Sequence, residues 1–93
     1  MKLVYMDNAA TTRPRQEVAE AMLPFLGERY GNPSSIYSIA REAKAALDEA
    51  RGKVAKAINA YPEEIIFTGS GTEADNMAIK GVAYANFKRG KHI

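Results

Sequence analysis

The sequence EEIIFTGSGTEADN, residues 63–76, passes from acidic to apolar to glycine-rich and then to helix-forming residues. Three consecutive large apolar residues, Ile65–Phe67, lie between a glutamate pair and a glycine-serine turn. This pattern is typical of a short strand that is buried on both faces, as in a parallel sheet. We therefore predict a strand over 64–68, a turn at 69–71 and a helix over 73–88. A buried strand followed by a helix indicates an α/β fold.

The helix predicted over 73–88 has clear signals at both ends. Thr72 and Asp75 resemble a capping box in which aspartate replaces glutamate. Apolar residues occur on several sides of this helix, which suits a helix packed against a sheet. Lys88 and Arg89 lie where the helix dipole favours cations, and Gly90 is a natural end.

The segment before the strand predicts a long helix over 35–59. Its apolar positions step by three and four residues and form one seam: Ala40, Ala43, Leu47, Ala50, Val54 and Ala57. Ser34 or Ser35 can cap its start, and Asn59 can end it. Glu49 and Lys53 form an i,i+4 pair in the favourable order. The seam is mostly alanine, so this helix is expected to pack closely against a neighbour.

A shorter helix is expected over 14–27, where Val18, Met22 and Leu26 recur every four residues. Pro24 lies inside that pattern and predicts a kink or an early end, because it lacks a backbone donor. Residues 1–13 are predicted to be extended, with an apolar stretch at 3–6 that favours an edge strand. Residues 31–35, GNPSS, are a dense turn signal.

Composition places the 93 residues in an ordinary class, with 46% hydrophobic and 26% charged side chains. These values argue against a disordered tail or a low-complexity linker, and no apolar run approaches the roughly 20 residues that a membrane helix needs. There is no cysteine, so neither a disulfide framework nor a thiolate metal site is possible within the chain, and no metal is expected. The net charge of +2 is spread out, which is weak evidence for nucleic-acid binding. We expect a soluble, cytoplasmic protein.

The order of elements also predicts that the chain is a truncated piece of a larger fold. A strand, a helix and Gly90 are followed by only three residues, where the next strand of a βα unit would begin. A lone parallel strand would leave two unpaired edges.

The turn between strand and helix is the candidate site for chemistry. In α/β folds ligands bind where a strand ends and a helix begins, and the first amides of that helix are unsatisfied donors. We therefore predict an anion site at Gly71 and Thr72. The pattern is neither a P-loop nor the dinucleotide fingerprint, which carries a third glycine. An ordinary capped turn without a ligand remains the alternative on these residues alone.

Three separated motifs carry a resemblance to a known family: MDNAATT at 6–12, GNPSS at 31–35 and EEIIFTGSGTEADN at 63–76. In this order they resemble the N-terminal part of the NifS/IscS-type cysteine desulfurases, in the class V aminotransferase group of fold-type I pyridoxal-phosphate enzymes. The resemblance covers essentially the whole chain, and residues 91–93 are similar to the start of the following strand. It implies a PLP-dependent transferase fold, with residues 1–13 belonging to the small domain and 14–93 beginning the large PLP-binding domain.

The resemblance also implies site residues. Gly71 and Thr72 match the glycine-threonine pair that holds the phosphate of pyridoxal 5'-phosphate, in agreement with the predicted anion site. The DNAATT and GNPSS loops lie near the substrate cleft of the family, so Asn8, Ala9 and Asn32 are candidate pocket residues. Shaping of the loops is the commoner use of such residues.

Catalytic residues of the family are not expected within this chain. The lysine that binds the cofactor, the aspartate at its ring nitrogen, the stacking histidine and the sulfur-accepting cysteine belong to motifs beyond residue 93. We interpret His92 as a residue at the start of a strand, and Lys80 and Lys91 match no cofactor-binding motif. Tyr37 departs from the family pattern, in which histidine is frequent.

The resemblance implies a parent enzyme that converts L-cysteine to L-alanine and a protein-bound persulfide, used for iron–sulfur cluster or thio-cofactor assembly. The implied partners are the remainder of its own polypeptide, a second copy in a homodimer and a sulfur-acceptor or scaffold protein, without nucleic acid or membrane. The 93 residues alone are expected to be inactive. Alternatives are another class V enzyme, such as a selenocysteine lyase or a small aminotransferase, and a non-catalytic helical interaction module.

Overall fold

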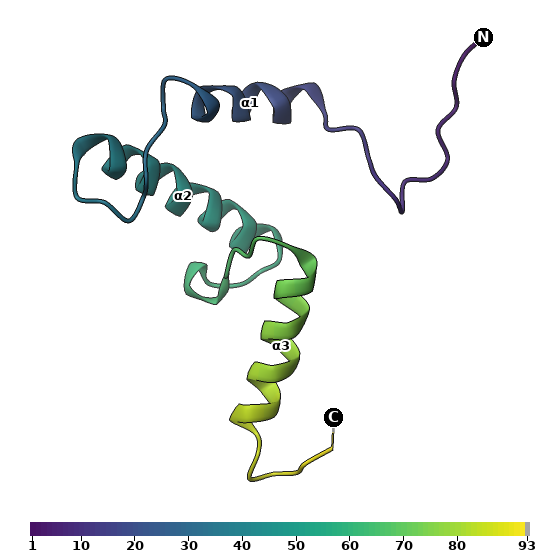
Figure 1. The fold of residues 1–93 in the computed structure, drawn as a ribbon, viewed down its shortest axis with the longest axis vertical. Coiled ribbons are helices and arrows are strands. Elements are labelled where there is room, and N and C mark those ends of the chain that lie inside the picture. The colour runs from purple at the N-terminus through teal and green to yellow at the C-terminus, as the bar shows by residue number, and fades with distance from the viewer. Residues whose placement is uncertain (93) are drawn as a thin grey trace. The chain divides into compact units, whose positions relative to one another are not determined.

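The computed structural model describes residues 1–92, which form three α-helices and one 3-10 helix (Figure 1). The elements are α1 (Gln16–Leu26), α2 (Ser38–Ala57), η1 (Pro62–Glu64) and α3 (Gly71–Ala85). They belong to two compact units, one covering Met1–Lys53 and the other beginning at Val54. The first holds α1 and most of α2, and the second holds the end of α2, η1 and α3.

α1 confirms the helix predicted from the Val18–Met22–Leu26 spacing, within two residues at its start and one at its end. The early end predicted at Pro24 does not occur: the helix includes this residue and continues to Leu26. The carbonyl of Pro24 then accepts the amides of Gly27 at 3.4 Å and Arg29 at 2.8 Å. The proline therefore helps to close the helix end rather than to interrupt the helix.

A groove of about 800 Å³ lies between α1 and the part of α2 that belongs to the first unit. Its apolar lining includes Val18 and Met22 of α1, and Ala46 and Ala50 of α2. Of the predicted seam, Ala40 is buried, at 3% exposed, and it lines the pocket beside Asn32 rather than this groove, while Val54 is 41% exposed.

The end of α2 follows the sequence prediction. Asn59 takes a left-handed conformation, with φ of 56°, and the Ala60 amide donates to the carbonyl of Ala55 at 2.9 Å. These features close a helix because they satisfy carbonyls that the last turn leaves open. η1 follows directly, and the Tyr61 amide donates to Glu64 Oε2 at 2.7 Å.

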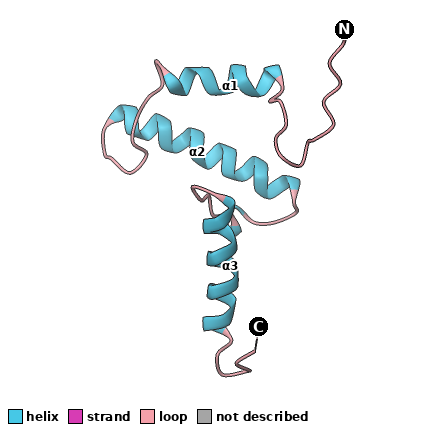
Figure 2. Ribbon diagram, turned by 45° about the vertical axis from the view of Figure 1, so that its right-hand side comes forward, coloured by secondary structure: helices cyan, strands magenta, loops and turns pink. Residues whose placement is uncertain are grey.

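The strand predicted over 64–68 does not form. Glu64 ends η1, Ile65 is extended with φ of −94° and ψ of 121°, and no strand occurs among residues 1–92 (Figure 2). Ile66 is 65% exposed, so these residues are not buried on both faces. A strand is stabilised by hydrogen bonds to a neighbouring strand, and the described part of the chain supplies none. The described part of the chain is therefore helical.

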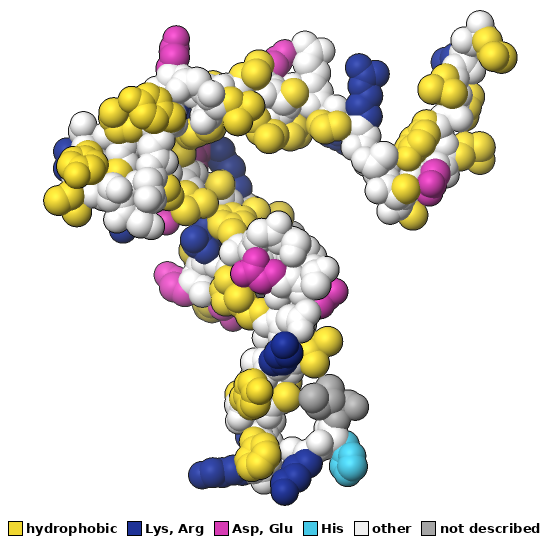
Figure 3. Space-filling model, in the orientation of Figure 1, with side chains coloured by type: hydrophobic (Ala, Val, Ile, Leu, Met, Phe, Trp, Pro, Cys, Tyr) yellow, Lys and Arg dark blue, Asp and Glu magenta, His cyan; other side chains and the backbone are white. Residues whose placement is uncertain are grey.

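Apolar side chains are widely exposed in both units. Within residues 1–92 the buried hydrophobic residues are Ala40 and Ala55, whereas large side chains such as Met22, Tyr84 and Phe87 are exposed. Figure 3 shows hydrophobic side chains along the surface of the helices. None of the helices described here combines the length and the apolar character needed to cross a membrane.

Candidate functional site

The turn that begins α3 carries the predicted anion site. Ser70 is the residue that caps this helix, and its Oγ accepts the amide of Glu73 at 3.2 Å. The prediction that Thr72 caps the helix is wrong. The helix begins at Gly71, two residues before the predicted start at residue 73. Both Ser70-x-x-Glu73 and Thr72-x-x-Asp75 fit the capping pattern, and the first is the one that forms.

Two further hydrogen bonds hold the residues just before α3. The Gly69 amide donates to Glu73 Oε2 at 2.8 Å. The Thr68 hydroxyl donates to the carbonyl of Ser70 at 2.9 Å. Glu73 therefore contacts the turn twice, through its backbone amide and through its carboxylate. Sequence reasoning did not identify the roles of Ser70 and Glu73, although the S-x-x-E spacing was a visible signal.

Gly71 and Thr72 lie in the sequence between Gly69 and Glu73, and within the described residues their backbone amides are not used as donors. Their amides donate to no acceptor among residues 1–92, as expected for the first turn of a helix. A Cβ added at Gly71 would meet no atom within 4 Å, so the backbone is open to a ligand there. Two free amides, the Thr72 hydroxyl and an open approach fit a phosphate group.

The DNAATT loop is a turn in the first unit. The Asp7 carbonyl accepts the amides of Ala10 at 3.1 Å and Thr11 at 3.5 Å, and the Thr12 hydroxyl donates to the carbonyl of Asn8 at 3.3 Å. Asn8 and Ala9 occupy the middle of this turn. Within the described residues the side-chain amide of Asn8 forms no hydrogen bond, which leaves it available to a ligand.

The GNPSS loop uses Asn32 to build its own shape. Asn32 Oδ1 accepts the amide of Ser34 at 3.0 Å, and the Asn32 carbonyl accepts the amide of Ser35 at 3.0 Å. Gly31, Asn32 and Tyr37 line a pocket of about 250 Å³ with the start of α2. Asn32 is therefore a turn-forming residue whose NH₂ group still faces no partner among residues 1–92.

The candidate residues fall into different units. Asn8, Ala9 and Asn32 belong to the first unit, and Gly71 and Thr72 belong to the second. Within the first unit, no hydrogen bond joins Asn8 to Asn32 among the described residues. The candidate residues therefore lie in three separate turns.

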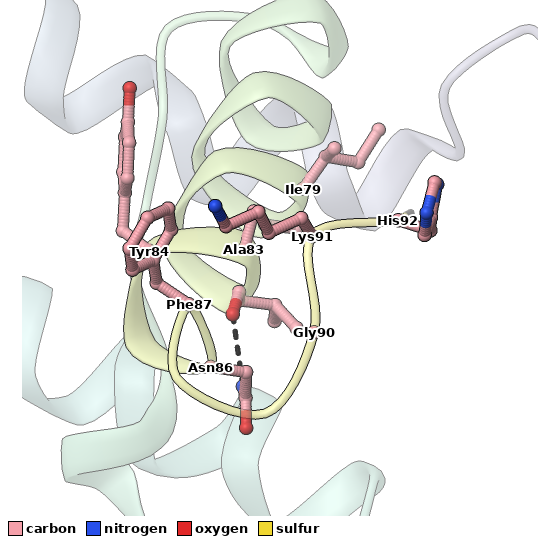
Figure 4. A pocket seen from close by; sticks show the side chains of 10 residues that line it. Ile79, Ala83, Tyr84, Asn86, Phe87, Gly90, Lys91 and His92 are labelled. Carbon is pink, nitrogen blue, oxygen red and sulfur yellow. Dashed lines mark hydrogen bonds between the residues drawn. The ribbon is translucent and has the colours of Figure 1, made fainter.

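A second pocket, of about 590 Å³, lies at the other end of α3 (Figure 4). The Lys91 ammonium lies 5.5 Å from the centre of the Phe87 ring, and the Asn86 side-chain amide donates to the carbonyl of Val82 at 2.9 Å. His92 lies across the pocket from Tyr84. A 15-residue helix separates this end from Gly71, a length of about 22 Å. Lys91 and His92 therefore do not contribute to the turn at Gly71 and Thr72.

Comparison with known proteins identifies the family to which the chain belongs. Residues 4–93 match the family described as aminotransferase class-V. The chain belongs to this family, whose members depend on pyridoxal 5'-phosphate.

Individual relatives of the chain carry more specific names. The chain is 62% identical over 90 residues to the cysteine desulfurase IscS of Dictyoglomus turgidum, covering 97% of this chain and 23% of that protein. It is 59% identical over 92 residues to the cysteine desulfurase IscS of Methanosarcina thermophila, covering 99% of this chain and 23% of the relative. A putative cysteine desulfurase IscS 1 of Bacillus subtilis is 48% identical over 93 residues, all of this chain and 24% of the relative. The chain spans about a quarter of the length of these relatives. No solved structure matches it.

Proposed function

We propose that this chain is the N-terminal part of a PLP-dependent cysteine desulfurase, in which Gly71 and Thr72 bind the phosphate of the cofactor. One observation carries the proposal: the two amides without acceptors lie in the motif that resembles the phosphate-binding turn of the family. The bound cofactor supplies a ring that draws electrons away from the substrate. The contribution of this chain is to anchor and orient it. Gly71 provides an open backbone, and Thr72 provides an amide and a hydroxyl.

The reaction proposed for the whole protein is removal of sulfur from L-cysteine, giving L-alanine and a protein-bound persulfide. A cysteine outside this chain would accept the sulfur, since the 93 residues contain none. We propose that the persulfide serves iron–sulfur cluster or thio-cofactor assembly through a sulfur-acceptor or scaffold protein. The names of the relatives support the reaction, and the particular acceptor is not specified by them.

Asn8, Ala9 and Asn32 are proposed to line the substrate pocket. The free side-chain amide of Asn8 and the remaining NH₂ group of Asn32 are donors suited to a carboxylate, such as that of an amino acid. We propose that residues 1–13 belong to the small domain and that 14–93 begin the large PLP-binding domain.

The remainder of the polypeptide is proposed to complete the fold. Residues 64–68 are proposed to become a strand when neighbouring strands are present, since Ile65 is already extended. The exposed apolar side chains of all three helices support a large covering partner, because faces of this extent are rarely left in water. A homodimer and a cytoplasmic location are further proposals that rest on the family resemblance and on composition.

A chimera tests the proposal. Residues 4–93 of this chain replace the matching segment of the Dictyoglomus turgidum cysteine desulfurase. We expect the chimera to bind pyridoxal 5'-phosphate, measured by its visible absorption, and to release alanine and sulfide from L-cysteine in the presence of a reducing thiol. The activity should lie within about tenfold of the parent enzyme, a loss of less than about 1.4 kcal/mol of transition-state stabilisation.

The Thr72→Val variant of the chimera tests the site itself. It removes the hydroxyl while keeping the size of the side chain. We expect cofactor affinity to fall about 10- to 100-fold, the loss expected for a hydrogen bond to a charged group. A chimera that folds but binds no cofactor would refute the proposed function, and a Thr72→Val variant with unchanged affinity would refute the assignment of Thr72.

A further inference from the structure

We infer that Glu73 is a positioning residue, which holds the turn before α3 so that the amides of Gly71 and Thr72 stay free for a phosphate. The inference rests on the proposed function of that turn. Glu73 accepts a hydrogen bond from neither of these two amides. Its backbone amide donates to Ser70 Oγ at 3.2 Å, and its carboxylate accepts the Gly69 amide at 2.8 Å.

These two hydrogen bonds enclose the proposed phosphate donors on both sides in the sequence. Gly69 lies before them and Glu73 after them, and both amides are already used. The Thr68 hydroxyl adds a third bond across the turn, to the carbonyl of Ser70 at 2.9 Å. A turn fixed in this way loses less conformational freedom when it binds an anion, because its ordering has occurred during folding. Glu73 thereby also determines which amides remain available.

The charge of Glu73 acts in the opposite direction. A carboxylate near a bound phosphate repels it, so the removal of Glu73 would strengthen binding if charge dominated. In the structure the carboxylate accepts the Gly69 amide, and its Oε2 lies 3.3 Å from where a Cβ on Gly69 would be. This close approach ties it to the residue before the phosphate donors. We infer that the positioning effect exceeds the repulsion.

Asp75 provides a matched control for the charge. It lies on the same turn of α3 and forms no hydrogen bond or ion pair over the part of the chain that the structure describes. Its removal changes the charge near the site without changing the contacts of Gly69. The contrast between Glu73 and Asp75 therefore separates geometry from charge.

The experiment uses the full-length chimera freed of cofactor. Dissociation constants are measured for pyridoxal 5'-phosphate and, by competition, for inorganic phosphate, together with the Tm of each protein. We expect Glu73→Ala to weaken both ligands by the same factor, about 5- to 20-fold. Glu73→Gln should recover most of the affinity, since its amide oxygen can still accept from Gly69. Asp75→Asn should stay within about twofold of the unsubstituted chimera.

The outcomes are distinguishable from failure of the proposed function. If Thr72→Val weakens binding and Glu73→Ala does not, or tightens it, the role of Glu73 is refuted and the site stands. Equal weakening by Glu73→Gln and Glu73→Ala also refutes it, because the hydrogen bond would then not matter. Should Glu73→Ala fail to fold, Ser70→Ala decides in the same assay: weaker binding supports the positioning role and unchanged binding overturns it.

Discussion

At the scale of single residues, the absence of a Cβ at Gly31 lets its backbone lie close to Ile39 in α2. A Cβ built there would lie 2.7 Å from the carbonyl oxygen of Ile39 and 2.9 Å from its Cγ2. The first of these atoms belongs to the backbone at the start of α2, so it cannot move aside easily. Gly31 therefore allows the turn that contains Asn32 to approach the helix closely.

We predict that Gly31→Ala destabilises the protein while Gly52→Ala does not. The added methyl group at Gly31 clashes, and overpacking of this kind costs about 1–3 kcal/mol. At Gly52, inside α2, an added Cβ meets no atom within 4 Å, and alanine is the better helix former by up to about 1 kcal/mol. Thermal unfolding of the chimera measures both. Equal Tm values for the two variants would contradict the steric role of Gly31.

Single residues also differ in how well the sequence predicts their roles in the candidate turns. The assignment of Gly71 and Thr72 to an anion site rests on a glycine turn before a helix and on the family motif, and it stays a prediction. Asn32 was correctly suspected of shaping its own turn, since asparagine side chains bond to nearby amides. The choice of Ser70 over Thr72 as the cap was missed, although Ser70-x-x-Glu73 carries the glutamate of the capping pattern, because Thr72 offers a similar hydroxyl two residues later.

At the scale of elements, α2 carries an i,i+4 ion pair on its exposed surface. Lys53 Nζ lies 2.6 Å from Glu49 Oε1, which confirms the predicted i,i+4 pair. The hydrogen bond from Lys53 lowers the pKa of Glu49 below its ordinary value of 4.5, and the positive charges of Lys53 and Arg29 act in the same direction. Both side chains are well exposed, so the pair is expected to add little to stability.

We predict that Lys53→Gln raises the pKa of Glu49 back toward 4.5. A carboxylate whose pKa is lowered in the helix contributes stability above pH 4.5, and this contribution is lost as the pH falls through the lowered pKa. A carbon NMR titration of the Glu49 carboxylate measures the shift directly. Lys44→Gln removes a lysine of α2 that is not paired with Glu49 and serves as the control. If both variants gave the same titration curve, the pairing with Lys53 would be contradicted.

Helices and the strand differ in how well local sequence specifies them. The helices α1, α2 and α3 were predicted within three residues at each end, because their hydrogen bonds and their apolar periodicity are local. The strand over 64–68 depends on hydrogen bonds to other strands, and residues 1–92 provide none. Burial of Ile65–Phe67 in a sheet, which the apolar run predicts, requires neighbouring strands from other segments and stays a prediction.

At the scale of the whole molecule, the main feature is the small amount of buried apolar surface. Ala40 and Ala55, at 3% and 1% exposed, are the buried hydrophobic residues in the described range. Alanine buries little area, so these two contribute little to the hydrophobic driving force for folding. Large side chains on α1 and α3 remain in contact with water.

We predict that the isolated chain of 93 residues unfolds without a cooperative transition and binds apolar dyes. It should produce no sulfide from L-cysteine and pyridoxal 5'-phosphate above the rate without protein. Circular dichroism during heating, dye fluorescence and a sulfide assay check these points, with the cooperative melt of the chimera as the control. A sharp transition in the isolated chain would instead favour the helical interaction module.

Exposed apolar side chains also affect how a cell would handle this polypeptide. Chaperones and quality-control proteases act on chains that display such surfaces, and marginal folding translates into low abundance. If the 93 residues were produced alone, rapid degradation is expected to keep their steady-state level low. The groove between α1 and α2, with Val18 and Met22 in its lining, is part of this exposed apolar surface.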